Sequence, residues 1–381
     1  MTAVTFGTSP HPAPASPAER ERILSAPRFG ESFSDHMALV DWTRDRGWFD
    51  PRVVPLGPIP AHPATGVLHY AQQVFEGLKV YRHPDGSLHA FRPELNARRL
   101  RRSARRLALP ELPEDLFLAS VDALVGADAA WVPGTPGHSL YLRPFVMASE
   151  TFLGVRATDE ARYCVIASPA GSYFPGAGDG VSLWLSTTYS RAGRGGTGAA
   201  KCGGNYASSL AAQQEACERG CDQALFTDAA TSGWVEEAGS MNIFFAFADG
   251  TLVTPPANGT ILEGVTRASV LELAADLGHP VDERPISVRE WADAAEAGDL
   301  VEVFATGTAA VITPIARLVG ADVLVTTPVT GLGPVAARLH RELTGIQYGT
   351  MPDRFGWMRP VAPGTGGRPR LSARQEITRS E

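Results

Sequence analysis

Short runs in which apolar and polar residues alternate recur along the chain. The clearest covers residues 139–148 (SLYLRPFVMA), where the alternation predicts a strand with Tyr141 and Arg143 on the same face. Residues 78–81 and 88–91 flank a His-Pro-Asp-Gly-Ser turn and are predicted to pair as a hairpin. Further strand segments are predicted at residues 29–48 (broken by turns), 163–170, 181–188, 223–227, 243–247 and 301–305.

Longer segments with the pattern of a helix separate these strands. Proline begins two of them, residues 93–107 and 334–346, as is common in the first turn of a helix. Other helices are predicted at residues 112–125, at 207–219, and from residue 267 onward. Because strands and helices interleave along the whole chain, the predicted fold class is α/β (α+β).

Length and glycine distribution predict two domains. The 381 residues are too many for one ordinary hydrophobic core. The segment 171–180 (GSYFPGAGDG) is rich in glycine between two strand-like segments, and is the predicted linker. Residues 25–170 are predicted to form a small α/β domain and residues 181–360 a large one. Residues 1–24 and 361–381 are predicted to be flexible tails.

Composition limits the possible partners. A formal net charge of −7, with 44% hydrophobic and 20% charged residues, indicates a globular protein and argues against nucleic acid or an anionic membrane as a partner. The sequence has no apolar run long enough to span a bilayer and no signal-peptide pattern, so we expect a cytoplasmic protein. The four cysteines are too scattered for a disulfide framework, and no metal site is predicted.

A lysine within a glycine-rich segment is the first candidate for chemistry. In residues 195–206 (GGTGAAKCGGNY), Lys201 lies between two glycine-rich runs and Tyr206 follows. The chain has one other lysine, Lys79. A flexible surface loop fits this spacing about as well as a reactive lysine does. Residues 193–198 match G-x-G-x-x-G, but no clean strand leads into them, so a dinucleotide site is not favoured.

A second candidate stretch lies downstream. In residues 234–245, Glu236 and Glu237 precede small residues and an apolar strand, which suits a carboxylate at a pocket edge, although two solvated acids fit this stretch slightly better on its own. The turn at 262–266 enters a helix and would offer free N–H groups to an anion, as could residues 306–308. An amine, a carboxylate and an anion site match the aldehyde, ring nitrogen and phosphate of pyridoxal 5'-phosphate.

Taken together, these motifs resemble the branched-chain amino acid aminotransferases, which are class IV pyridoxal-phosphate enzymes. The resemblance covers residues 25–358 and implies a two-domain fold with the active site at the domain interface and the cofactor bound by the large domain. The segments that resemble the family are residues 75–79 (FEGLK), 91–96 (FRPELN), 141–145 (YLRPF), 201–207 (KCGGNYA), 237–244 (EAGSMNIF), 262–267 (LEGVTR) and 306–310 (TGTAA).

The resemblance also implies roles for individual residues. Lys201 would bind the cofactor as a Schiff base and move a proton, Tyr206 would hydrogen-bond the ring hydroxyl oxygen, and Glu237 would pair with the pyridine nitrogen. The phosphate would be held by Arg99, Val265, Thr266 and Thr308. The substrate contacts would be Tyr70, Ser240 and the Ala309 backbone for the α-carboxylate, Phe29, Phe75, Tyr141, Val155 and Tyr173 for the side chain, and Arg143 for the distal carboxylate of glutamate.

The implied activity is transfer of the amino group between L-leucine, L-isoleucine or L-valine and 2-oxoglutarate, by a ping-pong mechanism in a homodimer. Alternative enzymes on the same scaffold are a transaminase for an unusual branched or aromatic 2-oxo acid, a D-amino acid transaminase and an aminodeoxychorismate lyase. A non-catalytic binding protein, using the arginine-rich helix at 98–106 or the G-x-G-x-x-G loop, would require the two candidate stretches to be coincidental.

The sequence departs from the family pattern at a few positions. Ser240 stands where many relatives have threonine, which keeps the hydroxyl group. Ala310 and Thr313 occupy the positions of a Cys-x-x-Cys redox pair in the mammalian relatives, so we expect no thiol switch of that kind. Cys202, next to Lys201, is interpreted as a small apolar filler rather than a reactive thiol.

Overall fold

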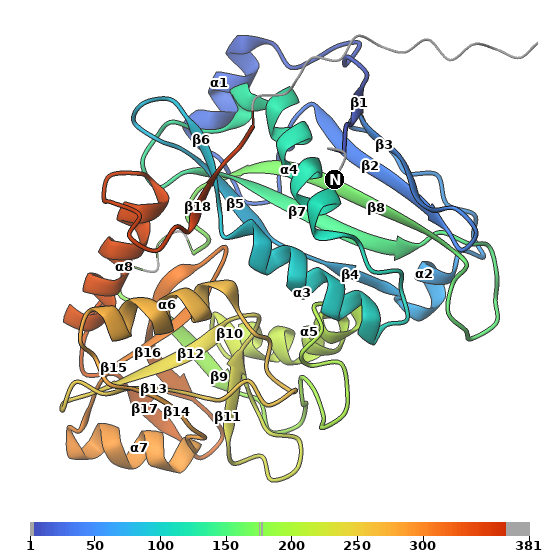
Figure 1. Cartoon of the computed structure of the whole chain (residues 1–381). Coiled ribbons are helices and arrows are strands. Elements are labelled where there is room, and N and C mark those ends of the chain that lie inside the picture. Colours follow the sequence, from blue (N-terminus) through green and yellow to red (C-terminus); the bar gives the residue numbers. More distant parts are fainter. Residues whose placement is uncertain (1–3, 175, 177, 363–381) are drawn as a thin grey trace, which may run out of the picture.

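Two nine-stranded sheets form the framework of the molecule (Figure 1). The computed structural model describes residues 4–174, 176 and 178–362. In spatial order, the first sheet consists of β1 (Gly7–Thr8), β3 (Gly47–Pro55), β2 (His36–Thr43), β8 (Glu160–Ala170), β7 (Ser139–Ala148), β5 (Leu78–Arg82), β6 (Leu88–Phe91) and β18 (Met358–Pro360), and β4 (Gln73–Phe75) pairs with β7.

The second sheet follows in the chain after residues 171–180, the segment expected to be the linker. In spatial order it consists of β11 (Val235–Ala238), β10 (Gln223–Thr227), β9 (Val181–Leu185), β16 (Val311–Val319), β15 (Leu300–Gly307), β12 (Asn242–Phe247), β13 (Leu252–Thr254) and β14 (Val281–Glu283), and β17 (Leu324–Thr326) pairs with β16.

Helices lie on both sheets, which confirms the α/β fold class. Their bounds are α1 (Pro17–Ser25), α2 (Gly66–Tyr70), α3 (Pro93–Arg106), α4 (Glu114–Ala127), a 3-10 turn (Ala129–Trp131), α5 (Gly203–Glu218), α6 (Val265–Asp276), α7 (Val288–Ala297) and α8 (Pro334–Gln347). Helices α3 and α4 pack on the first sheet, where Leu100 and Phe117 join a core with Val80 and Leu140.

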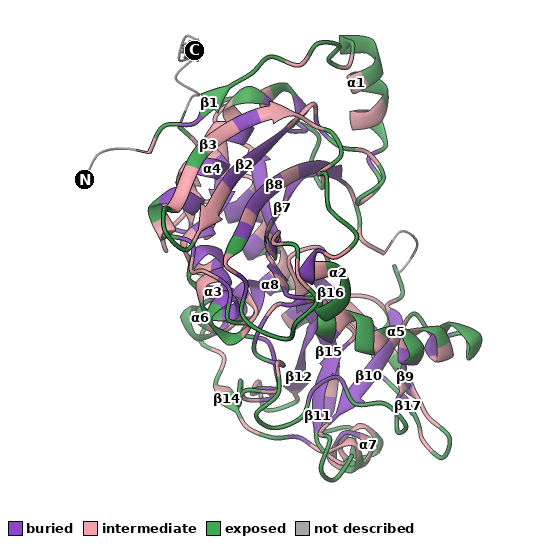
Figure 2. Ribbon diagram, turned by 90° about the vertical axis from the view of Figure 1, so that its right-hand side faces the viewer, coloured by how far each residue is buried: buried purple, intermediate pink, exposed green. Residues whose placement is uncertain are grey.

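The second sheet is buried on both faces. Along β12, Phe244 stacks on Phe304 with ring centroids 5.4 Å apart, in a core shared with α6 and α8. Its neighbour Phe245 points to the opposite face and contacts Trp291 of α7, with centroids 5.1 Å apart. Burial on two faces explains why this strand is continuously apolar rather than alternating, as Figure 2 shows by its buried colour.

Several elements differ from the sequence-based expectations. The supposed N-terminal tail contains β1 and α1, because Ser16 caps the helix at the N–H of Glu19 and Phe6 is buried against the first sheet. Strand β18 pairs with β6, so residues 358–360 belong to the first sheet and not to the second. Helix α7 and strand β16 were not predicted, and residues 363–381 of the expected C-terminal tail lie outside the described residues.

Helix α3 joins the two halves of the molecule. The first half is built on the sheet that contains β7, and the second half on the sheet that follows residues 171–180. The arginines of α3 divide by position: some bind acids of the first half, such as the Arg105–Glu111 pair at 2.7 Å. Others face the second half, where Arg102 binds Glu263 at 2.6 Å and Arg106 donates to the Gly195 carbonyl at 3.0 Å. The arginine cluster is therefore used within the fold. None of the helices in the described part of the chain has the length and apolar character to cross a bilayer.

Candidate active site

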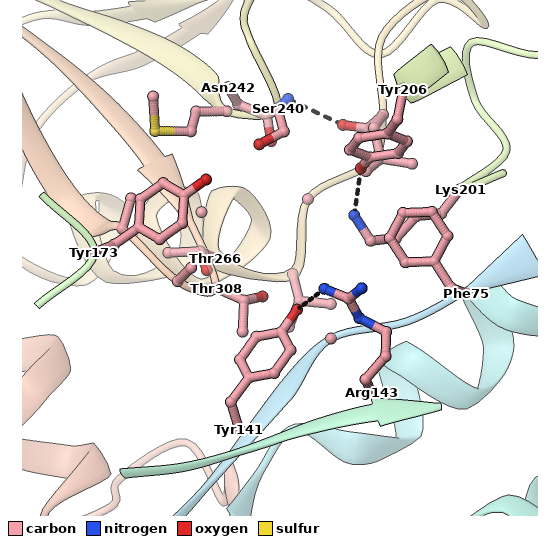
Figure 3. Close-up of a pocket in the computed structure, with 18 of the residues that line it drawn as sticks. Phe75, Tyr141, Arg143, Tyr173, Lys201, Tyr206, Ser240, Asn242, Thr266 and Thr308 are labelled. Carbon is pink, nitrogen blue, oxygen red and sulfur yellow. Dashed lines mark hydrogen bonds between the residues drawn. The ribbon is translucent and has the colours of Figure 1, made fainter. Parts of the chain in front are cut away.

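A cavity of about 540 Å³ is formed by residues from both sheets. Figure 3 shows how the labelled side chains surround it. Glu237, Tyr70 and Val155 are the predicted site residues that do not line it. The predicted residues among its lining are Phe29, Phe75, Arg99, Tyr141, Arg143, Tyr173, Lys201, Tyr206, Ser240, Val265, Thr266, Thr308 and Ala309.

Lys201 is fixed by backbone contacts to the first half. Its N–H donates to the hydroxyl of Ser103 on α3 at 2.9 Å, and its carbonyl accepts from the N–H of Phe75 at 2.9 Å. The side chain then reaches into the cavity, where Nζ donates to the Tyr206 hydroxyl at 2.5 Å (Figure 3). Helix α5 begins at Gly203, earlier than predicted, and Tyr206 lies in its first turn.

Burial changes the protonation of this pair. It lowers the pKa of Lys201 to about 8, and the positive charge of Arg99 acts in the same direction. A lysine with this pKa supplies far more neutral amine near neutral pH than an exposed lysine does. Burial raises the pKa of Tyr206 to about 12, so its phenol keeps its proton. The cavity therefore holds a nucleophilic amine beside a neutral hydroxyl.

An anion site lies at the start of α6. The helix begins at Val265 after Gly264, with no side chain capping its free N–H groups. Thr266 and Thr308 line the cavity beside it. The Oγ1 of Thr306, which also lines the cavity, is buried and has no partner among the described residues. Such a set of unpaired donors fits a phosphate or carboxylate group.

Arg99 was predicted as a phosphate ligand, and it lines the cavity in a fully paired state. Its Nε and Nη2 each donate to the Glu76 carboxylate at 2.7 Å, and Nη1 donates to the Glu263 carbonyl at 2.9 Å. Glu76 is fully buried and was not among the predicted site residues. The Phe-Glu-Gly-Leu-Lys motif contained it, but a lone glutamate gives no signal of a partner on a helix downstream.

Glu237 lies directly behind the cavity lining. Its Oε1 accepts from the Leu262 N–H at 2.6 Å and from Asn242 Nδ2 at 3.1 Å, and both of those residues line the cavity. Its Oε2 lies 2.6 Å from Arg191. Burial raises the pKa of Glu237, while Arg191 and the Leu262 N–H oppose that rise. Glu236, the preceding residue of β11, points to the opposite face of the strand and accepts a hydrogen bond from the Thr260 hydroxyl.

Arg191 was not predicted. It is 9% exposed and also donates to the Thr260 carbonyl at 3.0 Å, so it is a fixed part of the wall behind Glu237. It precedes the glycine-rich loop in the run Ser-Arg-Ala-Gly-Arg. In a chain rich in arginine, that run has no feature that separates this residue from a surface arginine.

The first half supplies the side-chain wall. Phe29 contacts Tyr141 and Tyr173 edge to face, with centroids 4.8 and 5.3 Å apart. Arg143 donates to the Tyr141 hydroxyl at 3.3 Å, as the shared strand face predicted, and its buried Nε has no partner among the described residues. A Cβ on Gly77 would meet the Tyr141 oxygen at 1.8 Å, which explains the glycine of the Phe-Glu-Gly motif.

Tyr70 and Val155, both predicted to contact substrate, lie away from the cavity of their own chain. Tyr70 ends the short helix α2, and its hydroxyl donates to the Leu153 carbonyl. Val155 lies in the loop between β7 and β8 and is 88% exposed. The two segments contact each other through this hydrogen bond, and neither residue lines the cavity of its own chain.

The charges around the cavity favour anionic ligands. Arg143 and Lys201 line it, whereas the charge of Arg99 is neutralised by Glu76. The described residues of the lining include no aspartate or glutamate. The aromatic wall of Phe29, Phe75 and Tyr173 is apolar. One cavity thus combines an amine, several anion-binding groups and an apolar surface.

Comparison with known proteins agrees with this arrangement. Residues 73–318 match the family described as amino-transferase class IV. A branched-chain-amino-acid aminotransferase from Mycolicibacterium smegmatis is 53% identical over 357 residues, covering 93% of this chain and 97% of that protein. A probable branched-chain-amino-acid aminotransferase from Streptomyces coelicolor is 50% identical over 363 residues, covering 95% and 100%.

Solved structures give the same answer. The branched-chain aminotransferase from the thermophilic archaeon Thermoproteus uzoniensis with norvaline has a TM-score of 0.69 at 29% identity, covering 85% of this chain and 100% of that one. The PLP-form of the Thermobaculum terrenum branched-chain amino acid aminotransferase has a TM-score of 0.72 at 26% identity, covering 87% and 100%. The chain therefore belongs to the class IV aminotransferases, in the group of the branched-chain-amino-acid aminotransferases.

Proposed function

We propose that the protein is a pyridoxal-phosphate-dependent transaminase that exchanges an amino group between L-leucine, L-isoleucine or L-valine and 2-oxoglutarate. The observation that supports it best is the 540 Å³ cavity that joins Lys201, an apolar aromatic wall and Arg143. An apolar wall suits a branched side chain, and an arginine suits the second carboxylate of 2-oxoglutarate.

The residues around the cavity fit the cofactor. Uncapped N–H groups at Val265 and Thr266, with the hydroxyl of Thr308, suit its phosphate. Glu237 suits its ring nitrogen, and Lys201 suits its aldehyde. When bound, pyridoxal phosphate supplies an aldehyde that condenses with primary amines and a ring that withdraws electrons from the substrate Cα.

Lys201 would act first as the amine that attaches the cofactor and then as a base at the substrate Cα. Both tasks need a neutral Nζ, which the lowered pKa of about 8 provides. The Tyr206 hydroxyl, 2.5 Å away, would fix the position of Nζ. Phe75 covers this pair, with Nζ 4.8 Å from its ring centroid, and would limit access of water.

Glu237 and Arg191 would act as a unit. A carboxylate beside the ring nitrogen favours a proton on that nitrogen, which strengthens electron withdrawal. Arg191, 2.6 Å from Glu237 Oε2, would keep the carboxylate ionised although it is buried. Asn242 holds the other carboxylate oxygen and would set its direction.

The two substrates would occupy the same space in turn, which is the condition for a ping-pong mechanism. A branched side chain would pack on Phe29 and Tyr173. For glutamate, Arg143 would bind the distal carboxylate with its guanidinium, whose hydrogen bond among the described residues is to the neutral Tyr141 hydroxyl. The hydroxyl of Tyr141, 3.3 Å from Arg143, would orient the guanidinium.

A homodimer forms part of the proposal. Apolar side chains gather on α2 and on the loop after β7: Leu68 is 61% exposed and Leu153 65% exposed, beside Tyr70 and Val155. An exposed apolar group of this kind is typical of a subunit interface. In a homodimer, Tyr70 and Val155 would contact substrate in the cavity of the second copy, since they do not line their own.

Amino transfer from each branched-chain amino acid to 2-oxoglutarate, measured as glutamate formed, tests the proposed activity. We expect turnover with leucine, isoleucine and valine, and none after Lys201→Ala. A protein that binds pyridoxal phosphate but transfers no amino group from these three donors would contradict the assignment of substrates. Size-exclusion chromatography with light scattering, which measures the molar mass in solution, tests the homodimer.

A further inference from the structure

The chain has only two lysines, and the proposed function uses one of them. The other, Lys79, lies on β5 and is 7% exposed. Burial lowers its pKa to about 8, as it does for Lys201. Every other Lys/Arg position in the sequence is arginine, so a surface role does not explain why this position is lysine. A buried lysine outside the main cavity needs a structural or functional explanation.

Lys79 contacts the turn that closes the cavity. Its Nζ donates to the Ala309 carbonyl at 3.2 Å. Residues Thr308, Ala309 and Ala310 form the turn between β15 and β16, and all three line the cavity. Lys79 itself does not line that cavity, so it holds the turn from the opposite side.

The turn has a strained backbone that needs such support. Val311, which follows it, has a φ of 58°, a left-handed conformation that a β-branched residue rarely adopts. Strain of this kind persists only where the surroundings hold it. The Thr313 hydroxyl donates to the Ala310 carbonyl at 2.9 Å, so the carbonyls of Ala309 and Ala310 are both held by side chains.

Fixing the Ala309 carbonyl also fixes the next N–H group. A trans peptide is planar, with its C=O and N–H pointing in opposite directions. Because the Ala309 carbonyl points to Lys79, the Ala310 N–H points away from Lys79, on the side where Ala309 and Ala310 line the cavity. The polarised peptide would therefore present a donor to an anionic ligand there.

The charge of Lys79 is also available to such a ligand. Among the described residues, no carboxylate forms an ion pair with its Nζ, and its bond to Ala309 is to a neutral carbonyl. A buried ammonium without a counter-charge is costly, and that cost falls when an anion binds nearby. A small cavity of about 10 Å³ separates Lys79 from Thr308 and Gln347.

We infer that Lys79 is a positioning residue for the substrate α-carboxylate: it holds the 308–310 turn so that its N–H groups face the carboxylate, and its charge favours a bound anion. This inference rests on the proposed function, because it takes a 2-amino or 2-oxo acid as the ligand. Lys79 touches neither substrate nor cofactor in this account, so it is not a catalytic residue.

The test compares two ligands of nearly equal shape on the pyridoxal-phosphate-loaded enzyme. Isothermal titration would measure the binding of 4-methylvalerate and of its uncharged amide, 4-methylpentanamide. We expect Lys79→Met to weaken 4-methylvalerate by about 10- to 100-fold, because the turn loses the hydrogen bond that positions it and the carboxylate loses a nearby buried cation. The amide should change by less than about threefold, because it gains little from a cation.

Gln347→Leu is the matched control. Gln347 lines the same small cavity and is buried, but its side-chain Oε1 has no hydrogen-bond partner among the described residues. It should leave both affinities within about threefold of wild type, as expected for a residue outside the binding contacts. Equal loss of both ligands in Lys79→Met, or unchanged binding of 4-methylvalerate, would overturn the inference.

A second measurement leaves Lys79 itself unchanged. Wild-type enzyme produced with ¹⁵N-labelled lysine has two lysine side-chain nitrogens to observe by NMR. The Lys201→Arg variant retains only the signal from Lys79, which assigns it. The Lys79 Nζ signal should shift when 4-methylvalerate binds and stay in place with the amide. No shift with 4-methylvalerate at saturation would overturn the inference. Failure of the wild type to bind 4-methylvalerate and to use leucine would instead overturn the proposed function.

Discussion

The two halves of the molecule build the cavity in different ways. The first half contributes side chains from strand faces, above all Tyr141 and Arg143 of β7, whose positions follow from strand alternation. The second half contributes a lysine loop, the start of α6 and the turn at 308–310, where backbone groups matter as much as side chains. From this difference we propose that the first half selects the substrate side chain and the second half holds the reacting groups.

The largest effect is expected from removing the amine of the second half. Lys201→Ala should lower transamination by at least about 10³-fold for every substrate, because both the nucleophile and the base are lost. Steady-state assays with leucine and with glutamate would measure it, with the melting temperature as a check on folding. Wild-type turnover by this variant would contradict the role given to Lys201.

The next effect should also be independent of the substrate. Glu237→Gln cannot hold a negative charge, so kcat should fall on the order of 10²-fold for leucine and glutamate alike. Cofactor affinity should fall less than kcat does, since the phosphate contacts remain. A larger loss of cofactor affinity than of kcat would make Glu237 an anchor for the cofactor and not part of the electronic effect.

A change in the first half should separate the substrates. Arg143→Ala should reduce kcat/KM for glutamate and 2-oxoglutarate by about 10- to 100-fold, because a charge-assisted hydrogen bond to the distal carboxylate is lost. Leucine should change by less than about threefold, because its side chain has no charge to lose. Equal losses on both substrates would show that the division between the halves is wrong.

The pH dependence should report Lys201 directly. Its pKa is lowered from 10.5 to about 8, so the neutral amine should increase about tenfold between pH 7 and pH 9 and then level off. Tyr206, with its pKa near 12, should not titrate in this range. The rate at which apo-protein takes up pyridoxal phosphate would measure this. A rate that keeps rising to pH 10 would indicate an unshifted lysine.

The smallest effect is expected at the aromatic wall. Phe29→Ala removes apolar contact from the side-chain pocket and should lower kcat/KM for leucine by about fivefold. Glutamate should lose less, since Arg143 remains. A greater loss on glutamate than on leucine would reverse the assignment of this wall to branched side chains.

The sequence predicted local features well. Alternation along residues 139–148 placed Tyr141 and Arg143 on one face, and Arg143 Nη2 lies 3.3 Å from the Tyr141 hydroxyl. The glycine-rich loop and Tyr206 lie within one stretch of chain, so their contact was also open to prediction. Helix α3 agrees closely with the predicted 93–107, because proline and a regular buried face mark it clearly.

Features that depend on distant contacts were missed. Arg191 pairs with Glu237 although helix α5 and strand β10 lie between them in the chain. Glu76 meets Arg99 across an intervening hairpin. Strand β18 has three residues, too few for a pattern, and finds its place by pairing with β6. Tyr70 and Val155 were assigned to the site by resemblance, yet within one chain they lie outside the cavity.

Absorbance of the bound cofactor tests the central claim most directly. Purified protein loaded with pyridoxal phosphate would be mixed with L-leucine and then, after removal of the amino acid, with 2-oxoglutarate. We predict that leucine removes the visible absorption band and that 2-oxoglutarate restores it, each without the other substrate present. A visible band that neither substrate changes would contradict the claim that this one cavity serves a branched-chain donor and a dicarboxylate acceptor in turn.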